Sequence, residues 1–219
     1  MIIIRGKKVL ISLGGTFEPI DSVRGITNRS SGKMGLALAK QAYISGADVT
    51  LIVANVSIRI SPLFNVIPVE TSEEMADAIF EIVGDYDIFI STAAVSDFKV
   101  VQRKNKKIDS ESPVSIDLKP TLKIIRQIKK INPNILLVGF KAESNITRQE
   151  IIKCARKQIS DAGSDIVVAN DVSREDCCFG SDKNEVLIIG DDVLTVPLAS
   201  KDEIAKTIME VISKRVSCR

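Results

Sequence analysis

The sequence predicts an α/β fold in which helices cover both faces of a mostly parallel sheet. Short, continuously apolar runs, typical of strands buried on both faces, alternate with segments whose apolar residues recur at helical spacing. Near the C-terminus, two apolar runs flank Gly190-Asp191-Asp192 and indicate a β-hairpin. No internal repeat or linker divides the sequence. We therefore expect one domain over residues 1–219, a three-layer Rossmann-like sheet with a C-terminal β-hairpin.

The elements of the first half follow from local patterns. A helix over 34–44 has apolar residues on one face and stops before Gly46, a residue type that commonly ends helices. Thr71, with Glu74 three residues later, marks the start of the next helix. The runs between them are uninterrupted and apolar, as in buried strands. These patterns predict strands at 9–13, 48–54, 66–69 and 87–92, and helices at 34–44 and 71–83.

The second half begins with a polar, lysine-rich stretch over 93–113 that has little periodicity. The alternation then resumes, and Ser200 supplies a capping residue for a closing amphipathic helix. The strands of the hairpin are expected at Glu185–Ile189 and Val193–Pro197. The remaining patterns predict strands at 115–118, 135–140 and 165–169, and helices at 121–131, 147–162 and 200–214.

Composition excludes several classes of protein. A net charge of +2 gives no overall reason to expect nucleic acid or an anionic membrane as a partner. No apolar run approaches the roughly 20 residues that span a bilayer, and the first residues lack the order of a secretory signal. We therefore expect a cytoplasmic protein.

The chain contains no histidine and four cysteines: Cys154, Cys177, Cys178 and Cys218. Because no CxxC pair is present, a zinc site is disfavoured, and we assign no residue as a metal ligand. We interpret the adjacent Cys177 and Cys178 as reduced thiols near a turn. The chemistry must then depend on Lys, Arg, Asp, Glu, Asn, backbone amides or a bound ion.

The connection Gly14–Gly35 is far longer than the roughly 2–6 residues usual between a strand and a helix, and we interpret it as an active-site loop. At its end, the free amides of a helix start beside Ser30, Ser31 and Gly32 suit an anion. A capped helix with a packing glycine is the alternative. The spacing matches neither GxGxxG nor GxxxxGK[ST]. At the loop's beginning, Gly14, Gly15 and Thr16 supply a tight turn with its own amides, or a purely structural turn.

In the same loop, Arg24 and Arg29 flank Asn28 within six residues. Arginine suits carboxylate or phosphate, whereas asparagine both donates and accepts and can hold a carbonyl group. Two arginines so close to Asn28 favour ligand binding over simple solvation.

A second polar cluster follows the strand at 87–92. Ala93, Ala94 and Val95 are small enough to leave room for a flat ligand against the backbone. Asp97 suits a ribose hydroxyl, an ion or a helix cap. Beyond it, five basic residues within nine positions form either a solvated loop or a mobile lid over phosphates: Lys99, Arg103, Lys104, Lys106 and Lys107.

Together these motifs resemble those of the phosphopantothenoylcysteine synthetase family. The resemblance rests on GGTFEPIDSVRGITNRSSGKMG, STAAVSDF, a lysine loop ending at Lys107-Ile108, VGFKAES and IVVAND, and extends from about Lys7 to Lys214. It implies a ligase of coenzyme A biosynthesis that joins 4′-phosphopantothenate to L-cysteine. In such enzymes CTP activates the carboxylate as an acyl-cytidylate and releases pyrophosphate, and cysteine then displaces CMP; eukaryotic relatives use ATP. The resemblance also implies Mg²⁺, a homodimer, and a fused or separate flavin-dependent decarboxylase as a partner.

Residue roles are carried over by position. The resemblance assigns Asn28 to handling of the acyl intermediate and Lys107 to activation of the carboxylate. Arg24 matches an arginine of the first motif, and the resemblance implies that it binds substrate together with Asn28 and Lys107. The nucleotide side is expected at Ala93, Ala94, Val95, Asp97 and Phe140, with Gly14, Gly15, Thr16, Ser30, Ser31 and Gly32 facing phosphates.

Three departures from the family pattern concern the nucleotide. The KIK pattern becomes Lys107-Ile108-Asp109, and the NPD turn becomes Lys119-Pro120-Thr121. Two lysines expected before IVVAND fall at Gln158 and Ala162, for which Lys153 or Lys157 would have to substitute, with Lys141 as an added charge.

Two rival functions stay open. An NAD(P)-dependent oxidoreductase predicts GxGxxG after the first strand and a Tyr-x-x-x-Lys pair, and the sequence contains neither. A non-catalytic nucleotide-binding subunit would keep the fold, but the presence of Asn28, Asp97 and Lys107 together argues against it.

Overall fold

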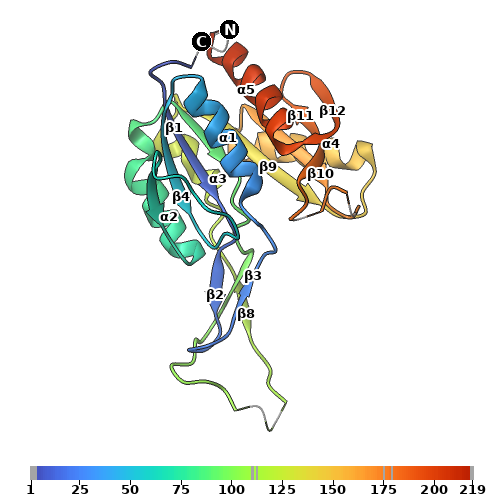
Figure 1. The fold of residues 1–219 in the computed structure, drawn as a ribbon. Coiled ribbons are helices and arrows are strands. Elements are labelled where there is room, and N and C mark those ends of the chain that lie inside the picture. The colour runs from blue at the N-terminus through green and yellow to red at the C-terminus, as the bar shows by residue number, and fades with distance from the viewer. Residues whose placement is uncertain (1–3, 110, 112, 175, 179, 218–219) are drawn as a thin grey trace.

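The computed structural model describes residues 4–217, apart from 110, 112, 175 and 179. Its centre is an eight-stranded sheet in the order β12-β11-β10-β9-β6-β1-β4-β5 (Figure 1). Neighbouring strands from β10 to β5 run parallel, and β11 and β12 add an antiparallel edge. The strands are β1 (Lys8–Leu13), β4 (Asp48–Val53), β5 (Asn65–Pro68), β6 (Ile88–Ser91), β9 (Leu136–Glu143), β10 (Ile166–Asp171), β11 (Lys183–Ile189) and β12 (Val193–Ser200).

Helices cover both faces of the sheet and make the predicted three layers. One face packs against α1 (Lys33–Ile44) and α5 (Lys201–Ser217). The other face packs against α2 (Ser72–Ile82), α3 (Ile125–Ile131) and α4 (Arg148–Ala162), and the short 3₁₀ helix η1 (Val83–Asp85) follows α2. No helix in these described ranges is long and apolar enough to cross a bilayer.

The strands form because their side chains are buried on both faces. In β1, Leu10 faces the α2–α3 layer, whereas Val9 and Ile11 face α1, and all three are fully buried. Each such side chain contributes about 1.5–3 kcal/mol on burial. Helix ends follow the expected chemistry, since the Thr71 hydroxyl accepts the Glu74 N–H at 3.1 Å at the start of α2.

The C-terminal hairpin is present, but it is part of the main sheet. β11 pairs antiparallel with β10, and β12 with β11. Leu187 and Ile189 of β11 are buried in one cluster with Ile151 and Ala155 of α4. Because α4 continues over β11, the hairpin extends the sheet and its buried face.

The largest departure from the predicted elements is a pair of small two-stranded sheets. β2 (Phe17–Pro19) pairs with β3 (Gly25–Thr27), and β7 (Phe98–Val100) pairs with β8 (Leu118–Pro120). We call residues 17–27 and 98–120, less 110 and 112, the arm, because they extend away from the main sheet (Figure 1).

Two predicted boundaries were therefore wrong. The strand expected at 115–118 lies at Leu118–Pro120, and the helix expected from 121 starts at Ile125. Thr121 is held out of the helix because its N–H donates to the Asp97 carbonyl at 3.0 Å and its hydroxyl to the Ser96 carbonyl at 2.5 Å.

The order of the strands indicates at which end of the sheet a ligand would bind. From β1 the chain passes to β4 and β5 on one side, then returns through α2 to β6 on the other side of β1. Ligands of such sheets bind beyond the carboxyl ends of the strands at this reversal. The segments that leave β1 and β6 there are the two polar clusters of the sequence, and Gly15 and Ala94 form an isolated parallel bridge between them.

Candidate functional site

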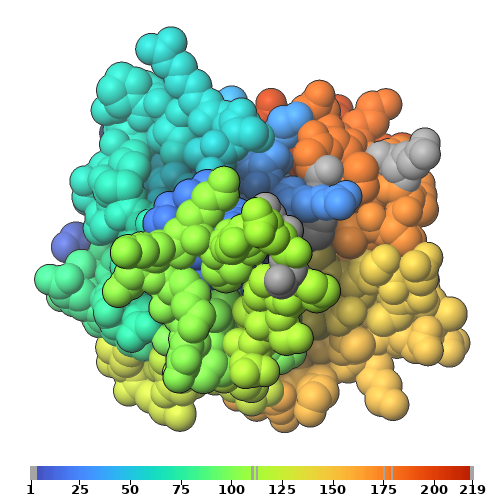
Figure 2. All heavy atoms as spheres, turned by 90° about the horizontal axis from the view of Figure 1, so that it is seen from below, coloured from blue at the N-terminus to red at the C-terminus, as the bar shows by residue number. Residues whose placement is uncertain are grey.

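A cavity of about 420 Å³ lies beyond the carboxyl ends of the strands. In Figure 2, which looks at this end of the molecule, the surface is hollowed between the green arm and the orange segment that follows β10. The lining comes from the start of α1, the segment after β6, the segment that enters α3, the end of β9, one face of α4, the β10–β11 connection and the start of α5.

Eight of the residues expected to bind the nucleotide line this cavity together. They come from three different strand ends, as the topology predicts. They are Ser30, Ser31, Gly32, Ala93, Ala94, Val95, Asp97 and Phe140.

Two glycines bring the start of α1 to the cavity. Gly32 caps the helix with φ 79°, and a Cβ there would lie 2.6 Å from Cγ1 of Val56. A Cβ at Gly35 would lie 2.5 Å from both Leu13 Cβ and Thr92 Oγ1, so the helix lies directly against β1 and the end of β6. The first-turn amides of α1, which have no acceptor within the helix, thus face the cavity end of the sheet.

Gly14, Gly15 and Thr16 lie one layer behind the lining. The Ala94 N–H donates to the Gly14 carbonyl at 2.8 Å, and the Ser96 N–H donates to Oγ1 of Thr16 at 2.9 Å in a buried contact. These residues shape the Ala93–Asp97 segment from below. Their direct contact with phosphate stays a prediction.

Asn28 also contacts the Ala93–Asp97 segment. Its Nδ2 donates to the Ala94 carbonyl at 3.0 Å, while the residue itself is exposed and is not among the lining residues. A Cβ at Gly15 would lie 2.8 Å from the Asn28 carbonyl oxygen. Gly15 therefore permits the close approach that places Asn28 beside Ala94.

Arg24 and Lys107 lie on the arm, outside the described lining. Arg24 Nη2 donates to the Ile108 carbonyl at 2.5 Å and Nε donates to Asp21 Oδ2 at 3.1 Å. Asp21 is buried and also accepts the Ile108 N–H. This hydrogen bond, together with those from Val23 and Arg24, lowers the pKa of the Asp21 carboxyl to about 2. Arg24 thus has structural partners in this chain, and Asp21 fixes the residue that follows the exposed Lys107.

Charged side chains from α3 and α4 form one wall of the cavity. Arg126 pairs with Asp161 at 2.7 Å, and Lys157 lies 3.6 Å from the same carboxylate. Lys157 therefore occupies the cavity wall, as the substitution for a family lysine requires, whereas Ala162 is a small buried position. On the facing segment, Asp97 pairs with Lys123.

Gln158 also belongs to this wall. A Cβ at Gly139 would overlap Nε2 of Gln158, so the amide lies close against the backbone of β9. Its Nε2 is buried and has no hydrogen-bond partner among the described residues. A buried donor without a partner is costly, and here it borders the cavity beside Phe140. Lys141, also lining the cavity, pairs with Glu143 at 2.9 Å.

The β10–β11 connection forms a further wall of the cavity. Cys177 is buried and Cys178 partly buried, and both line the cavity beside a turn, where the sequence placed them. Burial raises the pKa of the Cys177 thiol. Cys218 lies outside the described residues.

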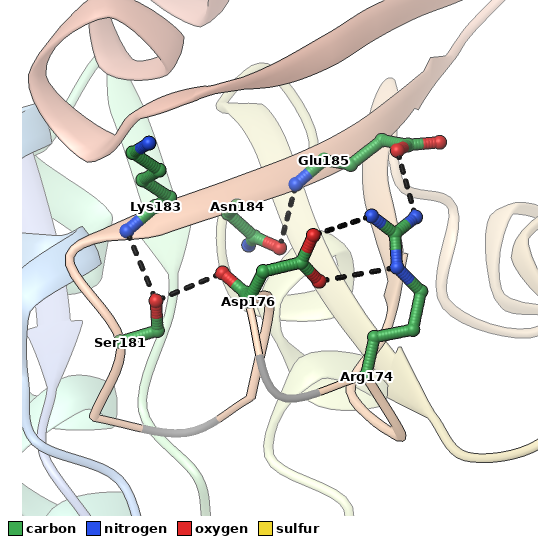
Figure 3. A network of polar contacts seen from close by, with 6 residues as sticks. All are labelled: Arg174, Asp176, Ser181, Lys183, Asn184 and Glu185. Atoms are coloured by element: carbon green, nitrogen blue, oxygen red, sulfur yellow. Dashed lines mark hydrogen bonds and ion pairs between the residues drawn. The ribbon is translucent and has the colours of Figure 1, made fainter.

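A polar network holds this wall in place (Figure 3). Arg174 pairs with Asp176 at 2.7 Å and with Glu185 at 2.9 Å, which ties the start of the connection to β11. The Ser181 hydroxyl donates to the Asp176 carbonyl at 2.8 Å and accepts the Lys183 N–H at 3.1 Å. The pKa of Arg174 is raised by its hydrogen bonds to Asp176 and then Glu185.

Sequence reasoning also missed two basic residues that line the cavity, Lys33 and Lys201. Lys33 was within the first motif but had no assigned role, and nothing local marks Lys201. Among the described residues, no group of three or more His, Cys, Asp or Glu side chains could hold a metal ion.

A doubly wound sheet with a cavity at its reversal point, lined by helix amides, small residues and basic side chains, defines a Rossmann-like ligand-binding protein. Comparison with known protein families identifies the family within this fold class. The model of the DNA/pantothenate metabolism flavoprotein C-terminal domain matches residues 4–216, and the chain belongs to this family.

Among curated relatives, the coenzyme A biosynthesis bifunctional protein CoaBC of Thermococcus kodakarensis is 46% identical over 216 residues, which cover 96% of this chain and 52% of the relative. The chain thus spans about half the length of these curated relatives. Among solved structures, the DNA/pantothenate metabolism flavoprotein from Streptococcus pneumoniae superposes with a TM-score of 0.85 at 29% identity, covering 96% of this chain and 100% of that one. The C-terminal domain of a CoaBC protein gives 0.84 at 28% identity, with 100% of both chains covered.

Proposed function

We propose that the protein is a phosphopantothenate–cysteine ligase that uses CTP. The carboxylate of 4′-phosphopantothenate attacks the α-phosphorus of CTP, pyrophosphate leaves, and the amine of L-cysteine then displaces CMP from the acyl-cytidylate. The observation that carries the proposal is the convergence of the α1 start, Ala93–Asp97 and Phe140 on one cavity in a chain 46% identical to a bifunctional coenzyme A biosynthesis protein. Both steps use good leaving groups, so positioning and charge stabilisation suffice without a histidine.

In this proposal the cavity binds the nucleotide. Ala93–Val95 and the half-buried Phe140 offer a flat apolar slot for a base, and the α1 amides and surrounding lysines offer positive charge for the phosphates. The carboxylates of Asp97 and Asp161 in the lining are each paired with a basic side chain. This donor set fits Mg²⁺ held chiefly by phosphate oxygens and water, as is usual for that ion with nucleotides.

Asn28 and Lys107 would act on the acyl group, and we propose that a second copy of the chain completes the site as a homodimer. The arm that carries Lys107 exposes a set of apolar side chains unusual for a solvated surface. They are Phe98 (52% exposed), Val101 (46%), Val114 (50%), Ile116 (39%) and Leu118 (45%). Burying them between two arms would bring each Lys107 loop toward a neighbouring cavity.

The partial coverage of the relatives supports a further partner. The matched relatives are bifunctional proteins of about twice this length. We propose that a flavin-dependent decarboxylase, fused or separate, acts on the ligase product, and that both work in the cytoplasm.

The deciding experiment mixes the protein with 4′-phosphopantothenate, L-cysteine and Mg²⁺ and compares CTP with ATP. We expect pyrophosphate and phosphopantothenoylcysteine with CTP, and omission of phosphopantothenate should abolish both. Product formed faster with ATP would overturn the choice of nucleotide only. No pyrophosphate with either nucleotide would overturn the ligase and favour a non-catalytic nucleotide-binding subunit, and reduction of a nicotinamide cofactor would favour the oxidoreductase.

A further inference from the structure

Two lysines that begin different helices converge on residues 180–182 of the β10–β11 connection. Lys33, the first residue of α1, donates from Nζ to the Gly180 carbonyl at 2.8 Å and pairs with Asp182 at 2.7 Å. Lys201, the first residue of α5, donates to the carbonyl of Ser181 between them. Both lysines line the cavity. Three consecutive residues of the β10–β11 connection thus hold two ammonium groups side by side.

The charges at this corner are not balanced. Asp182 is the carboxylate that the described contacts place against the two lysines, and its side chain is 87% exposed, whereas that of Lys33 is 33% exposed. Burial, and next the positive charge of Lys33, lowers the pKa of Lys201. Two partly desolvated cations thus share one carboxylate that faces water, and the corner retains an excess of positive charge.

The same corner contains further donors of the right kind. Lys33 follows Gly32, so its ammonium group lies on the helix whose first-turn amides and positive dipole end face the cavity. On the other side, the carbonyls of Gly180 and Ser181 are already occupied by the lysines. An anion entering here would meet these donors and would compete with the Asp182 carboxylate for them.

We infer that the Lys33–Lys201 corner is a pyrophosphate subsite: it binds a diphosphate group, with Lys201 and Lys33 as the two cationic contacts. Naming this group as the leaving pyrophosphate of the nucleotide rests on the proposed ligase function, but binding of the anion does not. Two ammonium groups on separate helices suit a ligand with two charged phosphoryl groups better than a single carboxylate.

Calorimetric titration with inorganic pyrophosphate alone tests the subsite. We expect Lys201→Gln and Lys33→Gln each to weaken binding by about tenfold or more, the usual scale for one lost charge-assisted hydrogen bond. Lys201→Arg should retain most of the affinity because it keeps the charge. Lys206→Gln, an exposed lysine of the same helix, is the matched control and should bind like the wild type.

Asp182→Asn gives the discriminating result. Removing the competing carboxylate should tighten pyrophosphate binding several-fold, an effect that a purely structural role of the corner would not produce. Unchanged affinity in both Lys201→Gln and Asp182→Asn, with wild-type melting curves, would overturn the subsite even if the ligase is active. Conversely, the expected binding pattern without turnover would refute the proposed function and leave the subsite standing.

Discussion

The carboxylate of Asp21 accepts the backbone N–H of Ile108 at 3.0 Å, across 87 positions of sequence. This contact joins the two hairpins of the arm, because Asp21 lies in the β2–β3 turn and Ile108 in the loop between β7 and β8. The same carboxylate accepts the N–H groups of Val23 at 2.7 Å and Arg24 at 2.8 Å. One buried anion therefore organises three backbone donors and fixes the position of the loop that contains Lys107.

Asp21→Asn should loosen the arm, because the amide presents N–H groups to donors that need an acceptor. Limited proteolysis at neutral pH should cut the 98–120 segment faster than in the wild type, and Asp117→Asn, an exposed carboxylate on the same segment, should not change it. The Asp21 pKa is lowered to about 2, so its contribution is present above the unfolded pKa and is lost as pH falls toward 2. The difference in Tm between wild type and Asp21→Asn should thus persist near pH 5 and shrink below about pH 4. Equal proteolysis of the two proteins would refute the clamp.

Gly35→Ala should destabilise the protein through a single methyl group. That methyl would lie 2.5 Å from Leu13 Cβ and Thr92 Oγ1, both held by neighbouring strands, so α1 must shift away from the sheet. We expect a loss of about 1–3 kcal/mol in the free energy of unfolding, measured by urea denaturation. Gly84→Ala is the control, since a Cβ there meets no atom within 4 Å. Equal stability of the two variants would show that the contact at Gly35 is not limiting.

Local sequence patterns could predict the elements that are stabilised by interactions between residues close in sequence. The run 9–13 is apolar at nearly every position because β1 is buried on both faces, and Thr71 and Glu74 mark the start of α2 through a contact three residues long. The strands of the arm have three residues each and no periodicity, and they are stabilised by contacts such as Asp21 with Ile108. No local pattern encodes such a contact.

The same distinction applies to the site. Ser30–Gly32 and Ala93–Val95 were predictable because strand ends converge in any parallel sheet. The meeting of Lys33 with Lys201 joins positions 168 apart through the packing of α1 on α5, and each lysine alone reads as an ordinary surface residue. Such sites become visible only when the tertiary structure brings the charges together.

Asn28→Asp and Lys107→Gln should block different steps if the roles carried over from the family hold. Asn28 donates to the Ala94 carbonyl at 3.0 Å, so a carboxylate at position 28 would lose this donor and repel that carbonyl. We expect Asn28→Asp to accumulate acyl-cytidylate and Lys107→Gln to prevent its formation, with product formation at least about a hundredfold slower in both. Quenched-flow chromatography with labelled CTP separates the two, and Lys106→Gln is the neighbouring control. Near-normal turnover in both variants would show the roles to be wrong.

Gln158→Met should raise the thermal stability of the free protein and test whether the Gln158 amide contacts the nucleotide. Nε2 of Gln158 is buried without a partner among the described residues, and an unpaired buried donor costs about 1–3 kcal/mol. Methionine has a similar shape and no donor, so the free protein should melt at a higher temperature. If Nε2 of Gln158 donates a hydrogen bond to the bound nucleotide, Gln158→Met should raise the KM for CTP about tenfold while the KM for cysteine stays constant. Gln149→Met, on the exposed face of α4, should change neither quantity. A variant that is more stable with an unchanged KM for CTP would show that Gln158 is packing alone.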